Sequence, residues 1–263
     1  MEDLDTPRVQ PGAADAILQT LRDFDFEWDG PVLFQSSRTQ EYREAFNDLR
    51  DRNLIYPCGC TRKEVADSVV GTSGDQRYSG VCRLGLQPGR SARSWRVRVP
   101  STRVSFEDRI QGRQVQNIEE YCGDFVVLRA DGLFAYQLAV VVDDRDQGVT
   151  DIVRGADLLH STPRQIYLQQ LLNAPVLRYL HTPVAVNASG QKLSKQTLAP
   201  AINQVTGAAT LQDALMFLGQ TPPIDLPLRA IWDWAIANWN PSRVPRTQSA
   251  PAPAGSLTGS RVR

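Results

Sequence analysis

Lysine, histidine and long apolar segments are scarce in this sequence of 263 residues. Of the 29 basic residues only three are lysines, namely Lys63, Lys192 and Lys195. No apolar run reaches the roughly 18 residues that a membrane span needs, and the acidic residues 1–5 lack the basic-then-apolar order of a signal peptide. We therefore expect a cytoplasmic protein without a membrane segment. The basic residues balance 29 acidic ones, which argues against a general polyanion coat but leaves room for a local basic face.

The sequence as a whole has the composition of an ordinary globular domain, with 41% hydrophobic and 22% charged residues. Apolar residues at helical spacing predict helices within 11–28, 39–54 and 210–219. Short apolar runs predict strands at 95–99, 125–128, 151–155 and 183–186. Helices that alternate with short strands favour an α/β fold. The Pro, Ala, Ser and Arg of residues 241–263 predict disorder.

Three of the four cysteines lie within residues 57–90, a stretch without periodicity that is too poor in apolar residues to build a core of its own. Cys58 and Cys60 flank one glycine, and Cys82 follows. Such thiolates suit a tetrahedral zinc ion, although the fourth donor stays open: Tyr78 lies four residues before Cys82, and both histidines are distant in sequence. The alternative is a set of buried or free thiols.

Two further groups of residues could bind a phosphorylated or anionic substrate. Lys192 and Lys195 follow a glycine turn, and mobile ammonium groups can follow a phosphate as it changes geometry. An exposed, solvated pair is the alternative, but the scarcity of lysine elsewhere favours a function. Tyr136 begins an apolar run that ends at Asp143 and Asp144, and with Arg154 it could hold a small carboxylate. The alternative here is a core helix with solvated ends.

Together these segments resemble a known family, the glutamyl-Q tRNA(Asp) synthetases, which are short paralogues of glutamyl-tRNA synthetase. The resemblance covers roughly residues 2–220. It rests on the order of five motifs: Glu-Asp-Leu-Asp-Thr-Pro-Arg at 2–8, Cys-x-Cys and Tyr-x-x-x-Cys within 58–82, Asp-Gly-Leu-Phe-Ala-Tyr-Gln-Leu-Ala-Val-Val-Val-Asp-Asp at 131–144, Gly-Val-Thr-Asp-Ile-Val-Arg-Gly-Ala-Asp-Leu at 148–158, and Lys-Leu-Ser-Lys-Gln at 192–196.

The resemblance implies a class I aminoacyl-tRNA synthetase catalytic domain, with a Rossmann-like parallel sheet and a zinc-binding insertion. The expected parts are residues 1–56 of the Rossmann-like fold, the zinc insertion at 57–90, the rest of the catalytic domain at 91–220 and a C-terminal extension at 221–263. The implied activity is tRNA-independent activation of L-glutamate by ATP with Mg²⁺. Transfer of glutamate to the queuosine base at the wobble position of tRNA(Asp) follows.

Matched residue by residue, the resemblance also implies a set of functional positions. The implied zinc ligands are Cys58, Cys60, Tyr78 and Cys82. Glu2 is expected to meet the ammonium group of glutamate, with Tyr136 and Arg154 lining the glutamate pocket. Lys195 corresponds to the second lysine of the loop that contacts ATP, and Lys192 to its neighbour.

The chain departs from the family at its start. Family members carry a first βαβ element with a His-and-Gly signature before the segment that matches Glu2, and this element is absent here. Either the start codon has been placed at an internal Met, which we favour, or the gene is truncated. As written, the chain is expected to have little or no activity.

Two alternatives to this function stay open. One is a fragment of a glutamyl-tRNA synthetase, although the resemblance places an Asn in those enzymes at the position of Val140. A zinc-stapled RNA-binding module without catalysis is the other. Arg90, Arg93, Arg96 and Arg98 are the candidate RNA contacts near the insertion, and we expect a monomer.

Overall fold

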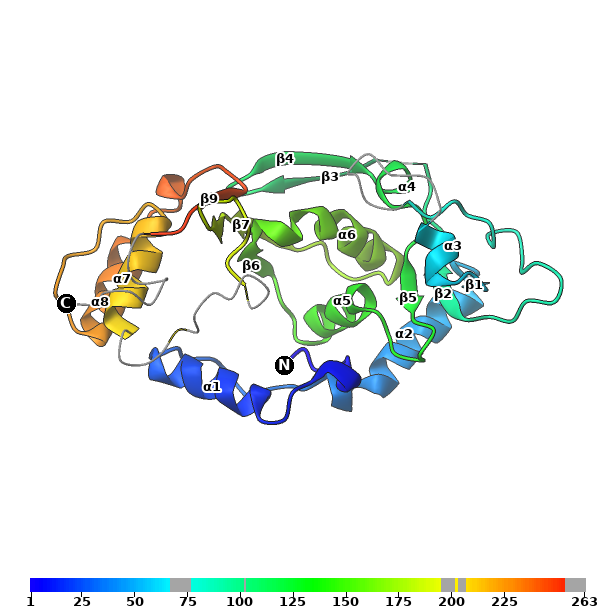
Figure 1. The fold of residues 1–263 in the computed structure, drawn as a ribbon, viewed down its shortest axis with the longest axis horizontal. Coiled ribbons are helices and arrows are strands. Elements are labelled where there is room, and N and C mark those ends of the chain that lie inside the picture. Colours follow the sequence, from blue (N-terminus) through cyan, green and yellow to red (C-terminus); the bar gives the residue numbers. More distant parts are fainter. Residues whose placement is uncertain (67–76, 102, 195–201, 203–206, 254–263) are drawn as a thin grey trace.

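Short helices and three small sheets build the chain, and the computed structural model describes residues 1–66, 77–101, 103–194, 202 and 207–253. The molecule is elongated, with α3, β1 and β2 at one end and α7 and α8 at the other (Figure 1). The helices are α1 (Ala13–Asp23), α2 (Thr39–Asp51), α3 (Arg62–Ala66), α4 (Ile118–Tyr121), α5 (Tyr136–Asp146), α6 (Thr162–Leu171), α7 (Gly207–Phe217) and α8 (Leu228–Asn238). The strands are β1 (Ile55–Cys58), β2 (Ser94–Val97), β3 (Arg103–Asp108), β4 (Gly112–Asn117), β5 (Val126–Leu128), β6 (Asp151–Gly155), β7 (Arg178–Thr182), β8 (Val184–Val186) and β9 (Ser249–Pro251).

The four-stranded sheet has the order β4-β3-β7-β6 and contains the parallel pairs that the α/β prediction requires. Strands β6 and β7 run parallel over their full length, β3 is parallel to β7, and β4 folds back antiparallel at the edge. The carboxyl ends of β6 and β7 therefore lie side by side at one edge of the sheet, and β3 ends at Asp108, opposite Tyr179 of β7. In α/β folds this is the edge at which ligands bind.

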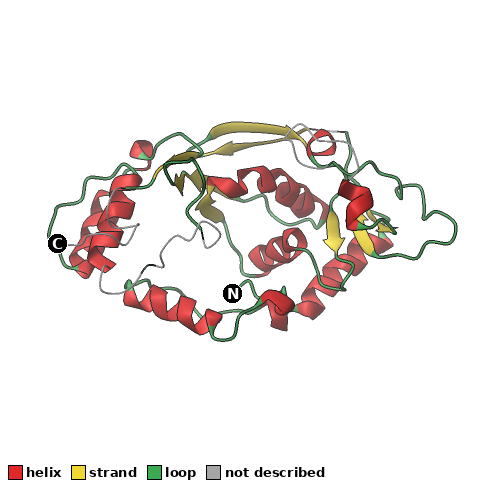
Figure 2. Cartoon of the chain, viewed as in Figure 1, coloured by secondary structure: helices red, strands yellow, loops and turns green. Residues whose placement is uncertain are grey.

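The strands expected near residues 95–99 and 125–128 are present, but they form a separate sheet. Strand β2 pairs antiparallel with both β1 and β5, so this sheet has the order β1-β2-β5. Figure 2 shows helices between this sheet and strands β6 and β7, and Figure 1 labels them α5 and α6. Antiparallel pairing with β2 is what fixes Cys58 opposite Ser94, at the outer end of the molecule.

The main core lies where α2, α5 and α6 pack together against the sheets. Helix α2 buries the residues that its periodicity predicted, Tyr42, Ala45, Phe46 and Leu49. Helix α5 is apolar on most sides because it is enclosed, and its buried positions include Leu138 and Val142. None of the helices within the described ranges has the length and apolarity needed to cross a bilayer.

The prediction of disorder for residues 241–263 is wrong for the part that the structure describes, 241–253. Strand β9 pairs in parallel with β8, from Val184 opposite Ser249 to Val186 opposite Pro251. Val244 packs with Ile110 and Leu180 in a small buried cluster. The composition misled because the segment depends on a partner strand some 65 residues earlier rather than on its own propensity.

A buried carboxylate on α5 ties this helix to α2. Asp143 accepts hydrogen bonds from Arg38 Nε at 2.7 Å, from the Tyr42 hydroxyl at 2.9 Å and from Gln35 Nε2 at 2.9 Å. Arg38 extends the network to Asp146. Three donors from one segment thus converge on one side chain of the neighbouring helix.

Replacing Asp143 with Ala is expected to destabilise the fold by about 3 kcal/mol, because it leaves a buried arginine and a buried hydroxyl without their main acceptor. The same replacement of the more exposed Asp146 is the matched control and is expected to cost less than about 1 kcal/mol. Urea unfolding of both variants measures the difference. An equal loss of unfolding free energy in both variants would show that Asp143 stabilises the fold no more than Asp146 does.

Candidate functional site

Arg154 lies near the carboxyl end of β6 and is held by neutral acceptors. Its Nε donates to His181 Nε2 at 3.1 Å, and one terminal nitrogen donates to Thr162 Oγ1 at 2.9 Å and to Gln165 Oε1 at 2.6 Å. Among the described residues no carboxylate lies within ion-pair distance of this guanidinium. Its charge is fixed in place but not neutralised, which suits an arginine that awaits an anionic ligand.

Thr162 precedes Pro163 at the start of α6, a pattern typical of a capping residue, but it does not cap this helix. Ser161 occupies the cap position, and no side chain caps the helix. The fully buried hydroxyl of Thr162 instead accepts from Arg154. The contact with a strand residue eight positions earlier outweighs the local capping preference.

Glu2, Tyr136 and Asp144 surround Arg154 closely enough for their charges to interact. Glu2 is exposed to an open cleft, yet the surrounding protein withdraws its carboxyl from water and raises its pKa, while the chain N-terminus and Arg154 oppose the rise. Burial likewise raises the pKa of Tyr136, and Glu2 adds to this effect. The structure thus brings together all three residues proposed for the glutamate pocket.

Asp144 is a fourth member of this group. Burial raises the pKa of its carboxyl to about 6, with Asp143 and Glu2 adding to the rise and Arg154 opposing it. Glu2 and Asp144 line a cleft of about 580 Å³ together with apolar residues of α1 and the loop after it, such as Ile17 and Trp28. Both carboxyls thus lie on this cleft, and the charge of Arg154 acts on each of them.

Gln165 lies between Arg154 and Tyr136. Its oxygen accepts a hydrogen bond from Arg154, and its side chain also interacts with the Tyr136 hydroxyl, which lowers the pKa of that phenol against the effect of burial. Gln165 therefore contacts two of the residues proposed for the glutamate pocket.

The structure describes only the first part of the loop that carries Lys192 and Lys195, up to residue 194. Residues 187–190 form the predicted turn, with Asn187 Oδ1 accepting from the backbone of Ser189 and Gln191. Lys192 follows, and its ammonium pairs with Asp157 just after β6. Lys195 lies outside the described residues.

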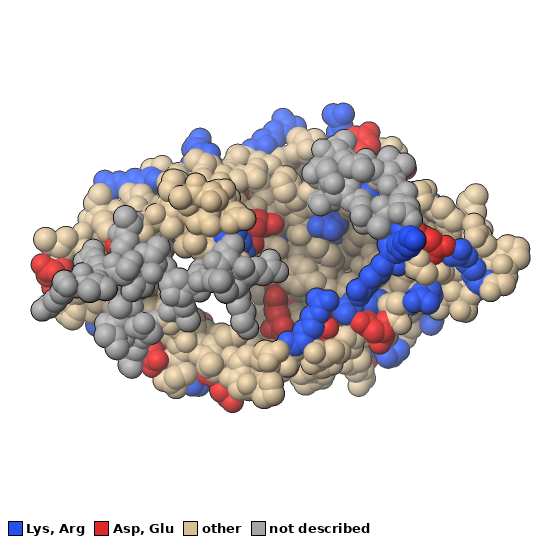
Figure 3. All heavy atoms as spheres, viewed as in Figure 1, with Lys and Arg blue, Asp and Glu red and all other residues tan. Residues whose placement is uncertain are grey.

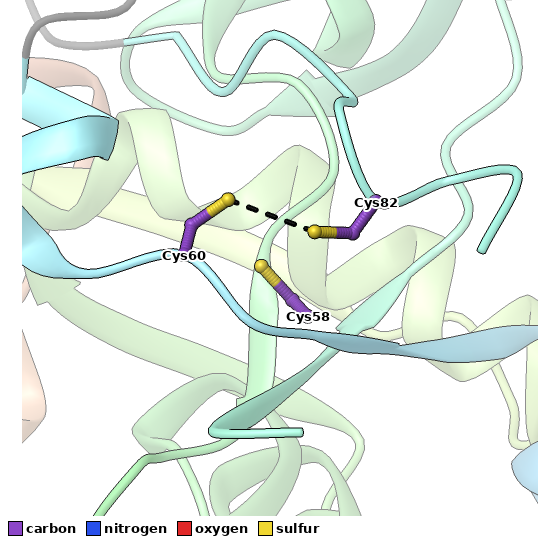
Figure 4. Close-up of side chains that lie close together, drawn as sticks. All are labelled: Cys58, Cys60 and Cys82. Atoms are coloured by element: carbon purple, nitrogen blue, oxygen red, sulfur yellow. Dashed lines mark hydrogen bonds between the residues drawn. The ribbon is translucent and has the colours of Figure 1, made fainter. Parts of the chain in front are cut away.

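Cys58, Cys60 and Cys82 point their sulfur atoms toward one another (Figure 4). All three sulfurs lie within 4.8 Å of one another, and those of Cys60 and Cys82 are 3.6 Å apart. With zinc–sulfur bonds of about 2.3 Å, a tetrahedral ion separates its sulfur ligands by roughly 3.8 Å. The three thiols can therefore hold one metal ion without large movement.

Tyr78 supplies a fourth atom on this cluster. Its hydroxyl lies 3.4 Å from Cys58 Sγ and 3.7 Å from Cys60 Sγ, and it accepts a hydrogen bond from the backbone N–H of Cys82. Burial raises the pKa of this phenol, so it would ionise only against a bound cation. The Tyr78 oxygen therefore lies where a metal ion held by the three thiolates would need its fourth donor.

The surroundings hold these donors in place. Gly123 has a φ of +68°, and a side chain there would lie 2.5 Å from the carbonyl oxygen of Tyr78. The buried Arg96 donates to Cys58 Sγ and lies 3.8 Å over the Tyr78 ring. Burial would raise the pKa of Cys58, but the hydrogen bonds from Tyr78 and Arg96 outweigh it and lower the pKa to about 7. Arg96 thus provides positive charge beside a cluster that must become anionic to bind metal.

A basic groove of about 840 Å³ runs beside the cysteine cluster. Arg62, Lys63 and Arg93 line it, all exposed and, within the described part of the chain, outside any ion pair. Figure 3 shows Lys and Arg side chains in a line between this end of the molecule and a central hollow with acidic residues. Arg129 also lines the groove and pairs with Asp5, three residues after Glu2.

Of the four arginines expected to contact RNA, Arg93 is exposed and has no ion pair within the described part of the chain, whereas the other three have partners. Arg96 is 7% exposed and serves the cysteine cluster. Arg98 donates to the carbonyl oxygen of Arg83 and lies over the Tyr56 ring, while Arg90 pairs with Glu64. The alternation of residues along β2 could not tell the buried arginines from the exposed one, because side chains on both faces of this strand are covered.

Sequence reasoning missed four residues around Arg154, namely Asp108, Asp144, Gln165 and His181. The Asp143-Asp144 pair was noted, but only the structure shows that Asp143 binds Arg38 whereas the charge of Asp144 interacts with that of Arg154. His181 is one of only two histidines, which was a usable signal.

Comparisons with known proteins agree with this arrangement. Residues 1–219 match the family model for the catalytic domain of class I tRNA synthetases (E and Q). The fold is that of glutamate-tRNA synthetase from Elizabethkingia anophelis, with a TM-score of 0.76 and 20% identity over 97% of this chain and 61% of that one. A glutamate tRNA ligase from Elizabethkingia meningosepticum gives a TM-score of 0.75, with 98% and 60% coverage. The chain thus spans about three fifths of the length of these solved synthetases.

The fold and the matched family define a class I tRNA synthetase catalytic domain of the glutamate and glutamine branch. Glutamyl-Q tRNA(Asp) synthetase of Aromatoleum aromaticum is 55% identical, over 96% of this chain and 81% of that protein. The protein of the same name from Dechloromonas aromatica is 54% identical, over 97% and 86%. The chain belongs to the glutamyl-Q tRNA(Asp) synthetase family, whose members are ligase-type enzymes.

Cys58→Ser is expected to lower the zinc content of the purified protein from about one ion per chain to near zero, and to loosen the segment around β1. In small modules the binding energy of structural zinc is also folding energy. Cys122→Ser, which alters a thiol outside the cluster, is the matched control. Metal analysis and proteolysis of the two variants provide the measurement. A wild-type protein without zinc would show that the cluster is not a zinc site.

Proposed function

We propose that this chain, with the low activity expected above, activates L-glutamate with ATP and transfers the glutamyl group to the queuosine base at the wobble position of tRNA(Asp). The single observation that carries the proposal is the charge arrangement at the carboxyl ends of the parallel strands. An arginine without a carboxylate partner among the described residues interacts through its charge with Glu2 and Asp144, and this pattern suits an amino acid that carries both carboxylates and an ammonium group.

The proposed roles follow from the chemistry of each side chain. Arg154 binds a carboxylate of glutamate, and Tyr136 gives a directional hydrogen bond. Glu2 receives the ammonium group, with Asp144 close enough to assist. A carboxylate oxygen of glutamate then attacks the α-phosphorus of ATP, and pyrophosphate leaves as glutamyl-adenylate forms.

Lys192 and Lys195 would serve the ATP, which enters as a complex with Mg²⁺. The ammonium of Lys192 rests on Asp157, a surface ion pair that costs little to break. We propose that it exchanges this partner for a phosphate when ATP binds. Lys195 takes the role of the second lysine of the loop by its place in the motif.

Zinc is the proposed metal, held by Cys58, Cys60, Tyr78 and Cys82. It would supply structural support by linking β1 to the segment that carries Tyr78 and Cys82. The role is support because Cys58, Tyr78 and Cys82 are buried and the four donors fill a tetrahedron. We further propose that the protein acts in the cytoplasm, where tRNA and ATP are present, and as a monomer.

The transfer reaction separates this proposal from its alternatives. Labelled glutamate is expected to attach to queuosine-bearing tRNA(Asp) whose 3′ CCA end has been removed, and not to the same tRNA with an unmodified wobble base. Label that requires the 3′ end would identify a glutamyl-tRNA synthetase activity instead. Binding of the tRNA without glutamate-dependent ATP consumption would identify a non-catalytic RNA-binding module. Either result overturns the proposal.

Arg154→Ala gives the matched test of the pocket. Loss of hydrogen bonds to a charged ligand is expected to raise the apparent KM for glutamate roughly 10- to 100-fold, with little change in the KM for ATP. The control is Arg145→Ala, which removes an arginine of α5 that pairs with Asp146. An unchanged KM for glutamate in the Arg154 variant would remove this residue from the pocket.

The basic groove is the proposed path of the anticodon stem and loop. Arg62, Lys63 and Arg93 have no carboxylate to neutralise them among the described residues, and Arg129 links the groove to the segment of Glu2 through Asp5. A phosphate backbone in this groove would bring the wobble base near the glutamate site. Phosphate contacts of this kind give a salt-dependent affinity.

Arg93→Glu is therefore expected to weaken binding of tRNA(Asp) several-fold and to flatten its dependence on salt concentration by about one phosphate contact. Glutamate-dependent exchange of ATP and pyrophosphate should not change, because the groove holds no substrate of that step. Arg113→Glu makes the same charge change on β4, outside the groove. Titrations at several salt concentrations compare the variants, and equal effects of both would exclude the groove as a specific tRNA contact.

A further inference from the structure

Behind Arg154 lies a buried pair formed by the last residue of β3 and a residue near the end of β7. The side chains of Asp108 and His181 are both fully buried, and Asp108 Oδ2 lies 2.6 Å from His181 Nδ1. The other ring nitrogen, Nε2, lies 3.1 Å from Arg154 Nε. The imidazole therefore connects a buried carboxylate to the guanidinium of the proposed glutamate pocket.

In the row Asp108–His181–Arg154, the chemistry of the guanidinium decides which atom donates in each hydrogen bond. A guanidinium only donates, so Nε2 of His181 must be the acceptor and carry no proton. The ring proton then lies on Nδ1 and is donated to Asp108. Thr162 Oγ1, at 3.2 Å, also lies beside Nε2. His181 is thus neutral, and it is present as a single tautomer.

Asp108 itself cannot turn. Its Oδ1 accepts from the backbone N–H groups of Ile110, Gln111 and His181, at 3.0, 2.8 and 3.2 Å. Burial alone would raise the pKa of this carboxyl, but the hydrogen bonds from His181 and from these backbone groups outweigh burial and lower it. The carboxylate is therefore a fixed acceptor that selects the tautomer of His181.

We propose that Asp108 and His181 are positioning residues that orient Arg154 for glutamate through the tautomer of the imidazole. The inference rests on the proposed role of Arg154 in binding glutamate. A serine-protease triad uses a buried carboxylate on a histidine in the same way, to hold the tautomer that the reaction needs. Here the group that depends on the tautomer is an arginine rather than a nucleophile.

Asp108→Asn tests this without changing the shape of the side chain. The amide oxygen must face the three backbone N–H groups, so the amide NH₂ faces His181 Nδ1. The ring then has to carry its proton on Nε2, where it opposes the N–H of Arg154. Two donors cannot share a hydrogen bond, and the guanidinium turns away. The expected result is an apparent affinity for glutamate reduced roughly 10- to 100-fold, with ATP binding unchanged.

The tautomer can be observed directly, because the chain contains only two histidines. In ¹⁵N spectra of the imidazole rings, the wild-type protein should show one neutral ring protonated on Nδ1, and the Asp108→Asn variant should show it on Nε2. His160→Gln assigns the signals by removing the other histidine. A wild-type ring protonated on Nε2, or an unchanged tautomer in the Asn variant, would overturn the proposal.

A second substitution separates positioning from a structural role. The side chain of His181→Gln reaches the place of Nε2 and can turn its amide oxygen toward Arg154, whatever residue stands at 108. Asp108→Asn with His181→Gln is therefore expected to bind glutamate better than Asp108→Asn alone. If the pair only supports the fold, the double variant should lose more stability and more affinity than either single variant, and that outcome also contradicts the proposal.

Failure of the proposed function would look different. A folded wild-type protein that shows the Nδ1 tautomer but binds no glutamate would refute the role of Arg154 and leave the hydrogen-bond chain as described. A wild-type protein that binds glutamate, together with an Asn variant of switched tautomer and equal affinity, would refute the positioning alone. Thermal unfolding of each variant checks that the protein remains folded.

Discussion

The ion pair between Asp143 and Arg38 is the interaction on which the site depends most. It fixes the rotation of α5 about its own axis, since Asp143 must face α2 to meet Arg38, Tyr42 and Gln35. With that face fixed, the charges of the neighbouring Asp144 and of Glu2 both interact with Arg154, and Tyr136 at the start of the helix is close enough to feel them. One buried carboxylate anchors the helix, and the next carboxylate in the sequence takes part in the site.

Two arginines show how the same side chain serves opposite purposes. Arg38 meets Asp143 and Asp146, so its charge is neutralised within the fold. Arg154 meets only an imidazole, a hydroxyl and an amide among the described residues. Neutral acceptors orient a guanidinium without cancelling its field, and this keeps the charge available for a ligand. A carboxylate in the place of His181 would hold Arg154 as firmly but would compete with glutamate for it.

Local pattern predicted much of the fold and part of the site. The spacing of Tyr42, Ala45, Phe46 and Leu49 was enough for α2, and the strand around Arg154 followed from a short apolar run. The pairing of Asp108 with His181 was beyond reach, because 73 residues separate them and only the parallel alignment of β3 with β7 brings them together. The same holds for β9, which depends on β8. Pattern identifies elements, whereas tertiary contacts decide which side chains meet.

The balance of charges in the composition conceals a division of labour among the basic residues. Near the cysteine cluster, Arg96 is buried against Cys58 and Tyr78, and Arg90 pairs with Glu64 on the surface. Arg62, Lys63 and Arg93 lie a few residues away in a groove where the described residues offer them no ion pair. A net charge of zero therefore does not argue against an RNA partner. The acidic residues neutralise arginines elsewhere, and a polyanion would meet the local field of the groove rather than the average of the chain.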